Sequence, residues 1–426
     1  MTEQLVSADY LDDLELRDPE QREQALFAAL PEFLVLAARK SPAVATLLQG
    51  FDLEAVNSRE GLAQLPVVRK SALIGLQAEQ PPFGGFASLQ SRHVRRVFAS
   101  PGPIHEPEGD TVNYWRMARA LYAAGIRAGE LVHNTFSYHF TPAGSMLESA
   151  AAALGCPVFA AGTGQTELQI ETIERLRPVA YAGTPSFLNI LLDRANESGS
   201  DLSSFRNALV SGEALPNALR ESIEKHGIHV SQCYATADVG LIAYESNARE
   251  GLIIDEETIV EIVCPGTGDP VAVGEVGEVV VTTFNPVYPL IRLATGDLSA
   301  ELPGISSCGR TNRRIRGWMG RADQTAKVRG MFIHPEQVAN VVARHAQISK
   351  ARLVISRVEL ADRMTLRCET SLQDATSGLG DLIQASVREL CKLRADIELV
   401  ASGSLANDGK VIDDVRPIDE FSSMDQ

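Results

Sequence analysis

Between Glu130 and Cys233 the chain alternates short apolar runs with helix-like segments, and this alternation leaves few folds open. The strand-type runs are LVHNTF, CPVFAAG, VAYAG, NALVSG and IHVSQC. The segments between them, such as TELQIETIERLRP and PSFLNILLDRA, have helical apolar spacing with Gly or Pro at their ends. This alternation predicts a parallel α/β sheet, because strands joined by helices run in the same direction. Ligands bind such sheets at the carboxyl ends of the strands.

The pattern changes on both sides of this region. Residues 1–60 predict helices, and Asp18-Pro19-Glu20 is a helix-start signal. After Gly251, strand-type runs joined by Gly/Pro turns predict an antiparallel β section. A further change near Gly320 introduces an α+β pattern of about 100 residues, large enough for a separate domain. We therefore predict an α/β fold with two domains. Residues 1–320 form a large N-terminal domain with layered α/β sheets, and residues 321–426 form a small α+β C-terminal domain.

Charge and cysteine content narrow the classes of partner and compartment. The net charge is −16 and no long basic run occurs, so we expect neither nucleic acid nor an anionic membrane as a partner. The six cysteines form no CxxC pair, which favours reduced thiols and a cytoplasmic location. The acidic N-terminus lacks the apolar core of a signal peptide, and no run of 18 apolar residues predicts a membrane span.

Three segments of the large domain carry residues suited to a nucleotide. RVFASPGPIHEPEG, 96–109, is a Gly/Ser loop after an apolar strand, which suggests a phosphate cradle of backbone N–H groups; a plain surface loop is equally compatible. VSGEALP, 210–216, and QCYATADVG, 232–240, each come at the end of a strand-type run. There Tyr234 offers a stacking face and Asp238 an oxygen ligand for Mg²⁺. Asp238 is alternatively a carboxylate at a helix N-terminus.

Three later segments suggest a sugar contact, a hinge and a mobile lysine. PLIRLATGDL, 289–298, predicts a strand that ends in Thr-Gly-Asp, so that Asp297 lies at a turn and can accept hydrogen bonds from vicinal sugar hydroxyls; an ordinary turn aspartate is the alternative. GWMGRADQTAKVRG, 317–330, lies at the domain boundary and suits a hinge or a solvated linker. LANDGKVIDDVR, 405–416, presents Lys410 at a turn, where a lone lysine is usually a solvated surface residue.

In this order and spacing, the segments resemble the adenylate-forming (acyl-CoA synthetase) superfamily and, within it, a divergent member of the phenylacetate–CoA ligase branch. The resemblance runs from about residue 60 to residue 416. LVHNTFSYHFTPAGSMLESAAAALGCPV matches that branch's Leu-Val-His-Asn stretch and the segment that walls its acyl pocket, and AGTPSFL, SGEALP, YATAD, IRLATGDL, GRADQ and DGK match its later motifs. The resemblance implies a large N-terminal domain and a small mobile C-terminal lid domain.

The resemblance also implies a two-step reaction. A carboxylate attacks the α-phosphate of ATP to give an acyl-adenylate and pyrophosphate, and a thiol, usually that of CoA, then attacks the adenylate after the small domain rotates. The implied cofactors are ATP, Mg²⁺ and CoA, and the implied substrate is a small carboxylic acid. Because relatives are often dimers, a homodimer is compatible with the resemblance.

Individual residues receive roles from the same resemblance. The implied catalytic residues are Lys410, which bridges the reacting carboxylate and the α-phosphate, and Asp238, the acid associated with Mg²⁺. The hinge is Asp323. The implied nucleotide-binding residues are Ser100, Gly102, Gly212, Glu213 beside the adenine, Tyr234 stacked on it, Asp297 at the ribose hydroxyls and Arg321 next to the hinge. The implied acid pocket has walls of Tyr138, Phe140 and Pro142 and a floor of Ala235, Thr236 and Ala237.

The sequence departs from the family's pattern most strongly at the phosphate loop. The aligned residues read Ser100-Pro101-Gly102-Pro103-Ile104-His105-Glu106-Pro107, so prolines replace donors and Glu106 stands where a lysine is expected. An acid facing the triphosphate would repel it, and the candidates for compensation are Arg92, Arg95 and His105. In addition, Asp238 replaces the usual glutamate and Ala235 replaces a glycine.

Some relatives in this branch carry a Cys/His zinc cluster. The matching positions here are Ser246, Ile253, Ser306 and Cys308. A structural zinc site needs four ligands, and a single thiol cannot supply them, so we predict no zinc.

Three functions stay open on the sequence. The first is an AMP-forming acid–thiol ligase that activates a small aryl or acyl carboxylic acid and transfers it to CoA, which the retained Lys410 and Asp297 favour. The second is a protein on the same fold that handles an acyl-thioester or adenylate but has lost ATP adenylation, which the proline-rich loop favours. The third is a non-catalytic binding protein.

Overall fold

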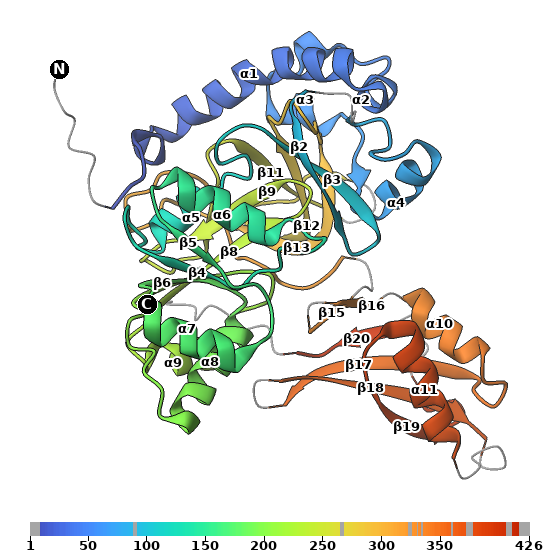
Figure 1. Cartoon of the computed structure of the whole chain (residues 1–426). Helices are drawn as coiled ribbons and strands as arrows, with labels where there is room; N and C mark the ends of the chain where they lie inside the picture. Colours follow the sequence, from blue (N-terminus) through green and yellow to red (C-terminus); the bar gives the residue numbers. More distant parts are fainter. Residues whose placement is uncertain are drawn as a thin grey trace. The chain divides into compact units, whose positions relative to one another are not determined.

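The computed structural model describes residues 9–87, 92–264, 268–322, 326–329, 331–333, 335–358, 361–371, 378–405 and 411–416. The chain divides into two compact units, one formed by the residues up to Met319 and one spanning Gly320–Asp419 (Figure 1). No helix in these described ranges combines the length and the apolar character that crossing a membrane would require.

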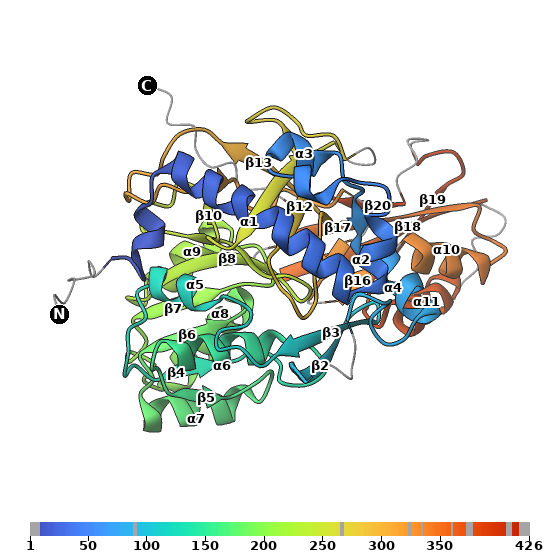
Figure 2. The ribbon, with the colours of Figure 1, turned by 90° about the horizontal axis from the view of Figure 1, so that it is seen from above.

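One continuous sheet forms the framework of the large unit. Its strand order is β11-β12-β13-β14-β10-β9-β8-β7-β6-β4-β5, and β1 (Val68–Arg69) pairs with β13. The parallel part consists of β4 (Val132–Asn134), β5 (Val158–Ala160), β6 (Ala180–Gly183), β7 (Asn207–Val210) and β8 (His229–Thr236), which Figure 2 shows side by side. These strands lie at the five runs that the sequence pattern identified, with β8 extending past Cys233, so the predicted parallel α/β sheet is confirmed.

Helices cover both faces of this parallel part. α5 (Ala118–Ala123) and α6 (Ala143–Ala153) lie on one face, and α7 (Thr166–Leu176), α8 (Pro185–Ser198) and α9 (Asn217–Glu224) lie on the other (Figure 1). In β6, Ala180 and Ala182 pack with α5 and α6, whereas Tyr181 packs with α7, α8 and α9. A strand that is buried on both faces reads as a continuous apolar run, and this explains the uniform sequence of these strands.

The antiparallel part of the sheet begins earlier along the chain than predicted. β9 (Gly240–Glu245) already runs antiparallel to β8, ahead of Gly251. The other strands of this part are β10 (Leu252–Ile254), β11 (Thr258–Val263), β12 (Val276–Thr283), β13 (Leu293–Leu302) and β14 (Arg314–Ile315).

Asp297 lies inside β13 and not at a turn after a strand, so the prediction from PLIRLATGDL is wrong on this point. The register between β12 and β13 shifts between Glu278 and Val280, opposite this position. Gly296 there has a φ of 78°, a conformation that glycine adopts without a steric penalty. The irregularity therefore accommodates the Thr-Gly-Asp sequence without ending the strand.

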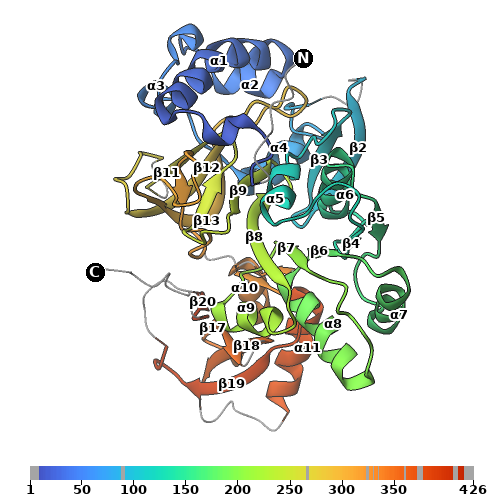
Figure 3. The ribbon, with the colours of Figure 1, turned by 90° about the vertical axis from the view of Figure 1, so that its left-hand side faces the viewer.

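The N-terminal helices gather beside the antiparallel strands, as Figure 3 shows. They are η1 (Asp13–Leu16), α1 (Pro19–Lys40), α2 (Pro42–Leu47), η2 (Leu53–Ala55), α3 (Arg59–Ala63) and α4 (Lys70–Glu79). α1 begins where the sequence predicts: Asp18 caps it by accepting hydrogen bonds from the N–H groups of Glu20 and Gln21. Phe27, Leu30 and Leu34 of α1 belong to the apolar cluster that includes residues of β9, β11 and β12.

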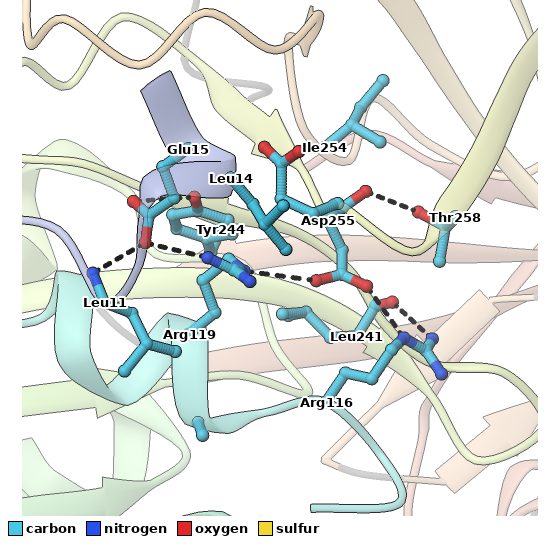
Figure 4. Close-up of polar contacts among 12 residues, drawn as sticks. Leu11, Leu14, Glu15, Arg116, Arg119, Leu241, Tyr244, Ile254, Asp255 and Thr258 are labelled. Carbon is cyan, nitrogen blue, oxygen red and sulfur yellow. Dashed lines mark hydrogen bonds and ion pairs between the residues drawn. The ribbon is translucent and has the colours of Figure 1, made fainter. Parts of the chain in front are cut away.

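A group of charged side chains, most of them buried, fastens the start of the chain to the sheet (Figure 4 shows Glu15, Arg119 and Asp255). We call Asp12, Glu15, Arg119, Asp255 and Arg310 the N-terminal ionic cluster. Glu15 is 1% exposed and accepts hydrogen bonds from Arg119 Nη1, at 3.0 Å, and from Arg310 Nε. Arg119 also binds Asp12 at 2.9 Å and lies 3.8 Å from Asp255. Each buried charge in the cluster thus has an opposite charge within reach.

The small unit is an α+β sandwich with its own core. Its main sheet has the order β19-β18-β17-β20, and β15 pairs with β16. The elements are β15 (Ala326–Val328), β16 (Met331–Ile333), α10 (Pro335–Ala343), β17 (Lys350–Val358), β18 (Ala361–Thr370), α11 (Leu379–Cys391), β19 (Asp396–Ala401) and β20 (Ile412–Asp414). Val338, Val341, Ile383 and Val387 of the two helices share one apolar cluster with the strands.

Candidate functional site

The carboxyl ends of β7 and β8 carry the two segments that the sequence singled out. Gly212 follows β7 with a φ of 81°, and Glu213 accepts a 2.5 Å hydrogen bond from Ser186 Oγ in the first turn of α8. This contact fixes the Glu213 carboxylate at the strand ends. Ala235 and Thr236 end β8 and are half-buried, and Ala237 begins the turn into β9.

Asp238 lies in that turn and is 1% exposed, so the alternative interpretation, a carboxylate at a helix N-terminus, is wrong. Lys70 Nζ donates a 2.5 Å hydrogen bond to Asp238 Oδ2. Asp238 Oδ1 is buried and accepts no hydrogen bond from any described residue. A buried carboxylate oxygen without a donor is costly, and it indicates that the site is built to receive a further positive group or proton donor.

Lys70 is the functional candidate that the sequence analysis missed. It is the first residue of α4, where the helix dipole disfavours a cation, and this unfavourable placement is the one sequence signal that was available. Burial lowers the pKa of Lys70, but the carboxylate of Asp238, together with those of Glu106 and Asp297, outweighs burial and raises this pKa. The ammonium group is therefore a fixed positive charge beside Asp238.

Arg116 links Asp255 of the N-terminal ionic cluster to the turn that holds Asp238. Arg116 donates from Nε to Asp255 Oδ2 at 2.8 Å and from Nη2 to the carbonyl oxygens of Val239 and Leu241 (Figure 4 shows the contacts with Asp255 and Leu241). Because Val239 follows Asp238 directly, this guanidinium group ties the backbone of the turn to the sheet.

The segment predicted as a phosphate loop is the tight turn of a hairpin between β2 (Val94–Ser100) and β3 (Ile104–Gly109). The sequence led us to expect the Glu106 carboxylate to face the triphosphate. Instead, Glu106 lies within β3 and is fully buried. Its carboxylate accepts hydrogen bonds from both Ser100 N, at 3.1 Å, and Ser100 Oγ. The hairpin thus uses the donors of Ser100 internally.

The buried position also changes the charge of Glu106. Burial, and next the negative charge of Asp238, raise the pKa of Glu106 to about 8, against opposing contributions from Ser100 and Lys70. The carboxyl group is then largely neutral near pH 7, so the repulsion expected from an acid at this position is removed without help from Arg92 or Arg95, which are exposed.

Glu106→Gln is expected to make the protein more stable at pH 8 to 9 and to flatten its pH dependence. The folded state holds the Glu106 proton at pH values where an unfolded chain, with a pKa near 4.5, has released it. The free energy of unfolding of the wild type therefore falls as the pH rises from about 4.5 to about 8, by an amount of the order of a few kcal/mol. Urea unfolding at several pH values, without nucleotide or divalent metal, measures this. Parallel profiles for the two proteins would contradict the assignment.

The predicted wall of the acid pocket is only partly assembled. Asn134 Nδ2 donates to Tyr138 Oη at 2.9 Å, and Pro142 is buried at the start of α6. Phe140 is 81% exposed and has a φ of 61°, so its ring is open to solvent and does not pack into a wall. Its carbonyl oxygen accepts a 2.8 Å hydrogen bond from Ala99 N, which joins this loop to the β2–β3 hairpin.

Asp297 lies beside Tyr234, although 63 positions separate them. Tyr234 Oη donates to Asp297 Oδ2 at 2.8 Å and lies 3.0 Å from Thr295 Oγ1. Trp318 Nε1, which the sequence analysis did not single out, donates to Asp297 Oδ1 at 3.1 Å. The structure thus brings the predicted stacking residue and the predicted sugar-binding carboxylate together.

The predicted residues not yet placed are Gly102, Arg321, Asp323 and Lys410. Arg321 is half-buried in the small unit. Asp323 and Lys410 lie outside the described residues, so their predicted roles stay predictions. Gly102 lies in the β2–β3 turn. Across the part of the chain that the structure describes, no group of three or more His, Cys, Asp and Glu side chains is placed to hold a metal ion.

Comparison with known proteins adds independent findings. The family described as "AMP-binding enzyme" matches residues 112–285. The phenylacetate–coenzyme A ligase of Thermus thermophilus is 31% identical over 338 residues, which cover 76% of this chain and 75% of that protein. The phenylacetate–coenzyme A ligase of Aromatoleum evansii is 30% identical over 337 residues, 75% of each chain.

Solved structures agree on the fold. A 2-hydroxyisobutyryl-CoA ligase in complex with 2-HIB-AMP and CoA superposes with a TM-score of 0.83 at 24% identity, covering 98% of this chain and 94% of that one. An amide bond synthetase of Marinactinospora thermotolerans gives a TM-score of 0.57 at 18% identity, covering 87% and 77% of the two chains. At these identities the likeness concerns the fold alone.

Proposed function

Because this chain belongs to the phenylacetate–coenzyme A ligase family and is an AMP-forming acid–thiol ligase, we propose that it activates a small aryl or acyl carboxylic acid with ATP and transfers the acyl group to CoA. The relatives named for phenylacetate support an aryl acid, and the half-open wall around Tyr138 and Phe140 is compatible with either class.

One observation carries this proposal: the 2.8 Å hydrogen bond between Tyr234 Oη and Asp297 Oδ2. A single nucleoside needs an aromatic face for its base and a carboxylate for its ribose hydroxyls within one ligand's length of each other. The bond brings these two groups together from β8 and β13. Glu213, fixed by Ser186 at the neighbouring strand end, supports a contact with the adenine edge.

The proposed reaction has two steps, adenylate formation and thioester formation. A carboxylate oxygen of the acid forms a bond to the α-phosphorus of ATP, the bond from that phosphorus to the bridging oxygen breaks, and pyrophosphate leaves. The thiol sulfur of CoA then forms a bond to the acyl carbon, AMP leaves with the former carboxylate oxygen, and the thiol proton is released. Both steps bring anions together, so fixed positive charge and alignment are what the protein must supply.

Two groups of this chain suit that electrostatic task. Lys70, with its raised pKa, holds a positive charge at the strand ends beside Asp238. Asp238 Oδ1, buried and without a donor among the described residues, fits as a ligand for Mg²⁺, which when bound would neutralise phosphate oxygens. Lys410 as the bridge between carboxylate and α-phosphate, Asp323 as hinge and Arg321 beside it remain part of the proposal on the family resemblance.

A second candidate rests on the hairpin. Because both Ser100 donors bind Glu106, this hairpin offers less to a triphosphate than a Ser/Thr-rich loop would. A protein that accepts a preformed acyl-adenylate or thioester needs no such loop. Tight, Mg²⁺-dependent ATP binding in calorimetry would exclude this alternative.

Acid-dependent ATP–pyrophosphate exchange is the direct test of the proposed function. We expect labelled pyrophosphate to enter ATP when an aryl or short acyl acid is present and not when it is absent, since exchange requires reversal of adenylate formation. A panel should include phenylacetate, benzoate, 2-hydroxyisobutyrate and short fatty acids. Absence of exchange across this panel, with protein that is folded by circular dichroism, would overturn the proposal.

A further inference from the structure

We propose that Trp318 is a positioning residue for nucleotide binding: its indole N–H fixes the Asp297 carboxylate in the orientation that accepts both ribose hydroxyls. This inference rests on the proposed function. It adds a group that neither the family resemblance nor the sequence motifs identified, and it follows from the 3.1 Å contact between Trp318 Nε1 and Asp297 Oδ1.

The Asp297 carboxylate is held at both of its oxygens. An ionised carboxylate has two oxygens with about four acceptor positions between them, so it can accept from protein donors and from ligand hydroxyls together. Trp318 Nε1 donates to Oδ1, and Tyr234 Oη donates to Oδ2. Because the two protein donors bind opposite oxygens, they fix the carboxylate plane before the nucleotide arrives, and a prealigned group loses less entropy on binding.

The backbone around Trp318 is itself held in place. Arg316 N donates to Ala300 O and Met319 N donates to Leu298 O, both at 2.9 Å, so residues 316–319 continue to pair with β13 after β14 ends. Thr295 Oγ1 accepts from Asp297 N at 3.1 Å and fixes the other side of the Thr-Gly-Asp segment. Trp318 is half-buried, and this pairing fixes the backbone from which its indole N–H reaches Asp297.

Trp318 also lies close in sequence to the boundary between the two units. Trp318 lies two residues before Gly320, where the small unit begins. A nucleotide that engages Asp297 thus also engages the last residues of the large unit through one hydrogen bond.

The experiment measures binding of AMP, 2′-deoxy-AMP and 3′-deoxy-AMP to the full chain by calorimetry. Trp318→Phe keeps an aromatic ring and removes the N–H. We expect AMP to bind about tenfold more weakly, the usual effect of losing one hydrogen bond to a charged group. We also expect the loss of affinity between AMP and either deoxy analogue to become severalfold smaller, because a misaligned carboxylate no longer binds the hydroxyl that the analogue lacks. The inference would be overturned if Trp318→Phe bound AMP as tightly as the wild type and lost as much affinity for the two deoxy analogues as the wild type does.

The chain supplies a matched control in its only other tryptophan. Trp115 is 2% exposed, and its Nε1 has no acceptor among the described residues. Trp115→Phe removes an indole N–H that has no acceptor in the described structure, so the affinity for AMP and the losses of affinity for both deoxy analogues should stay at the wild-type values. The same variant leaves Trp318 as the sole tryptophan, and its fluorescence should change when AMP binds. Equal weakening of AMP binding in both variants would indicate a general structural effect and contradict the positioning role.

A double-mutant cycle separates positioning from structure. If Trp318 acts through Asp297, Trp318→Phe should have no further effect on AMP binding once Asp297 is changed to Ala. Additive losses would overturn the inference, and so would the absence of any loss from Asp297→Ala. If the wild type bound no AMP, the proposed function and this inference would both fail. If the wild type bound AMP and Trp318→Phe left the affinity ratios between AMP and its deoxy analogues unchanged, this inference alone would fail.

Discussion

Asp238→Asn is expected to lower the rate of acid-dependent ATP–pyrophosphate exchange by about 10²–10³-fold, the size of effect seen when one preorganised electrostatic group is lost. Asparagine keeps the shape of the side chain but removes the negative charge that pairs with Lys70 Nζ at 2.5 Å. The substitution also changes Asp238 Oδ1, the oxygen that we assign to Mg²⁺. This oxygen is buried and accepts no hydrogen bond in the described structure. Initial exchange rates at saturating ATP and acid measure the effect.

Two controls make this result specific. Asp238→Glu restores a carboxylate one methylene longer and should recover much of the lost rate. AMP binding should change little in Asp238→Asn, because AMP lacks the phosphates that Mg²⁺ neutralises. Exchange within threefold of the wild type in Asp238→Asn would show that this carboxylate has no part in the reaction.

Glu15→Ala is expected to lower the free energy of unfolding of the large unit by about 3–5 kcal/mol, the cost of removing one partner from a buried ion pair. Glu15 is 1% exposed and neutralises Arg119 and Arg310, both of which are buried. Without Glu15, Arg310 loses its ion-pair partner within the described structure, and Arg119 retains only Asp12 and Asp255. Urea unfolding followed by circular dichroism measures the change.

An exposed acid nearby provides the comparison. Glu20, in the first turn of α1, is exposed, so Glu20→Ala should change stability by less than about 0.5 kcal/mol. Glu15→Gln keeps the volume and should lie between the two. If Glu15→Ala cost no more than Glu20→Ala, the N-terminal ionic cluster would not stabilise the fold.

The tertiary structure corrected the sequence analysis where a residue's surroundings come from distant segments. Glu106 stands in a loop by alignment, but β3 turns it inward, where burial and Asp238 raise its pKa and keep it largely neutral. Asp297 follows an apolar run that normally ends in a turn, but a register shift between β12 and β13 keeps it within the strand. Neither the direction of a side chain nor a register shift is visible in a single stretch of sequence.

Local pattern by itself determined the five parallel strands, the helices between them, the N-cap of α1 and the segments that carry Glu213, Tyr234, Asp238 and Asp297, because periodicity, capping and turn chemistry act over a few residues. Only the tertiary structure decided what those side chains meet: Lys70 against Asp238, Trp318 and Tyr234 against Asp297, and Glu15 against Arg119 and Arg310. These contacts join residues 21 to 295 positions apart. Hydrogen bonds and ion pairs act over a few ångströms, so only the folded chain can bring such partners within range.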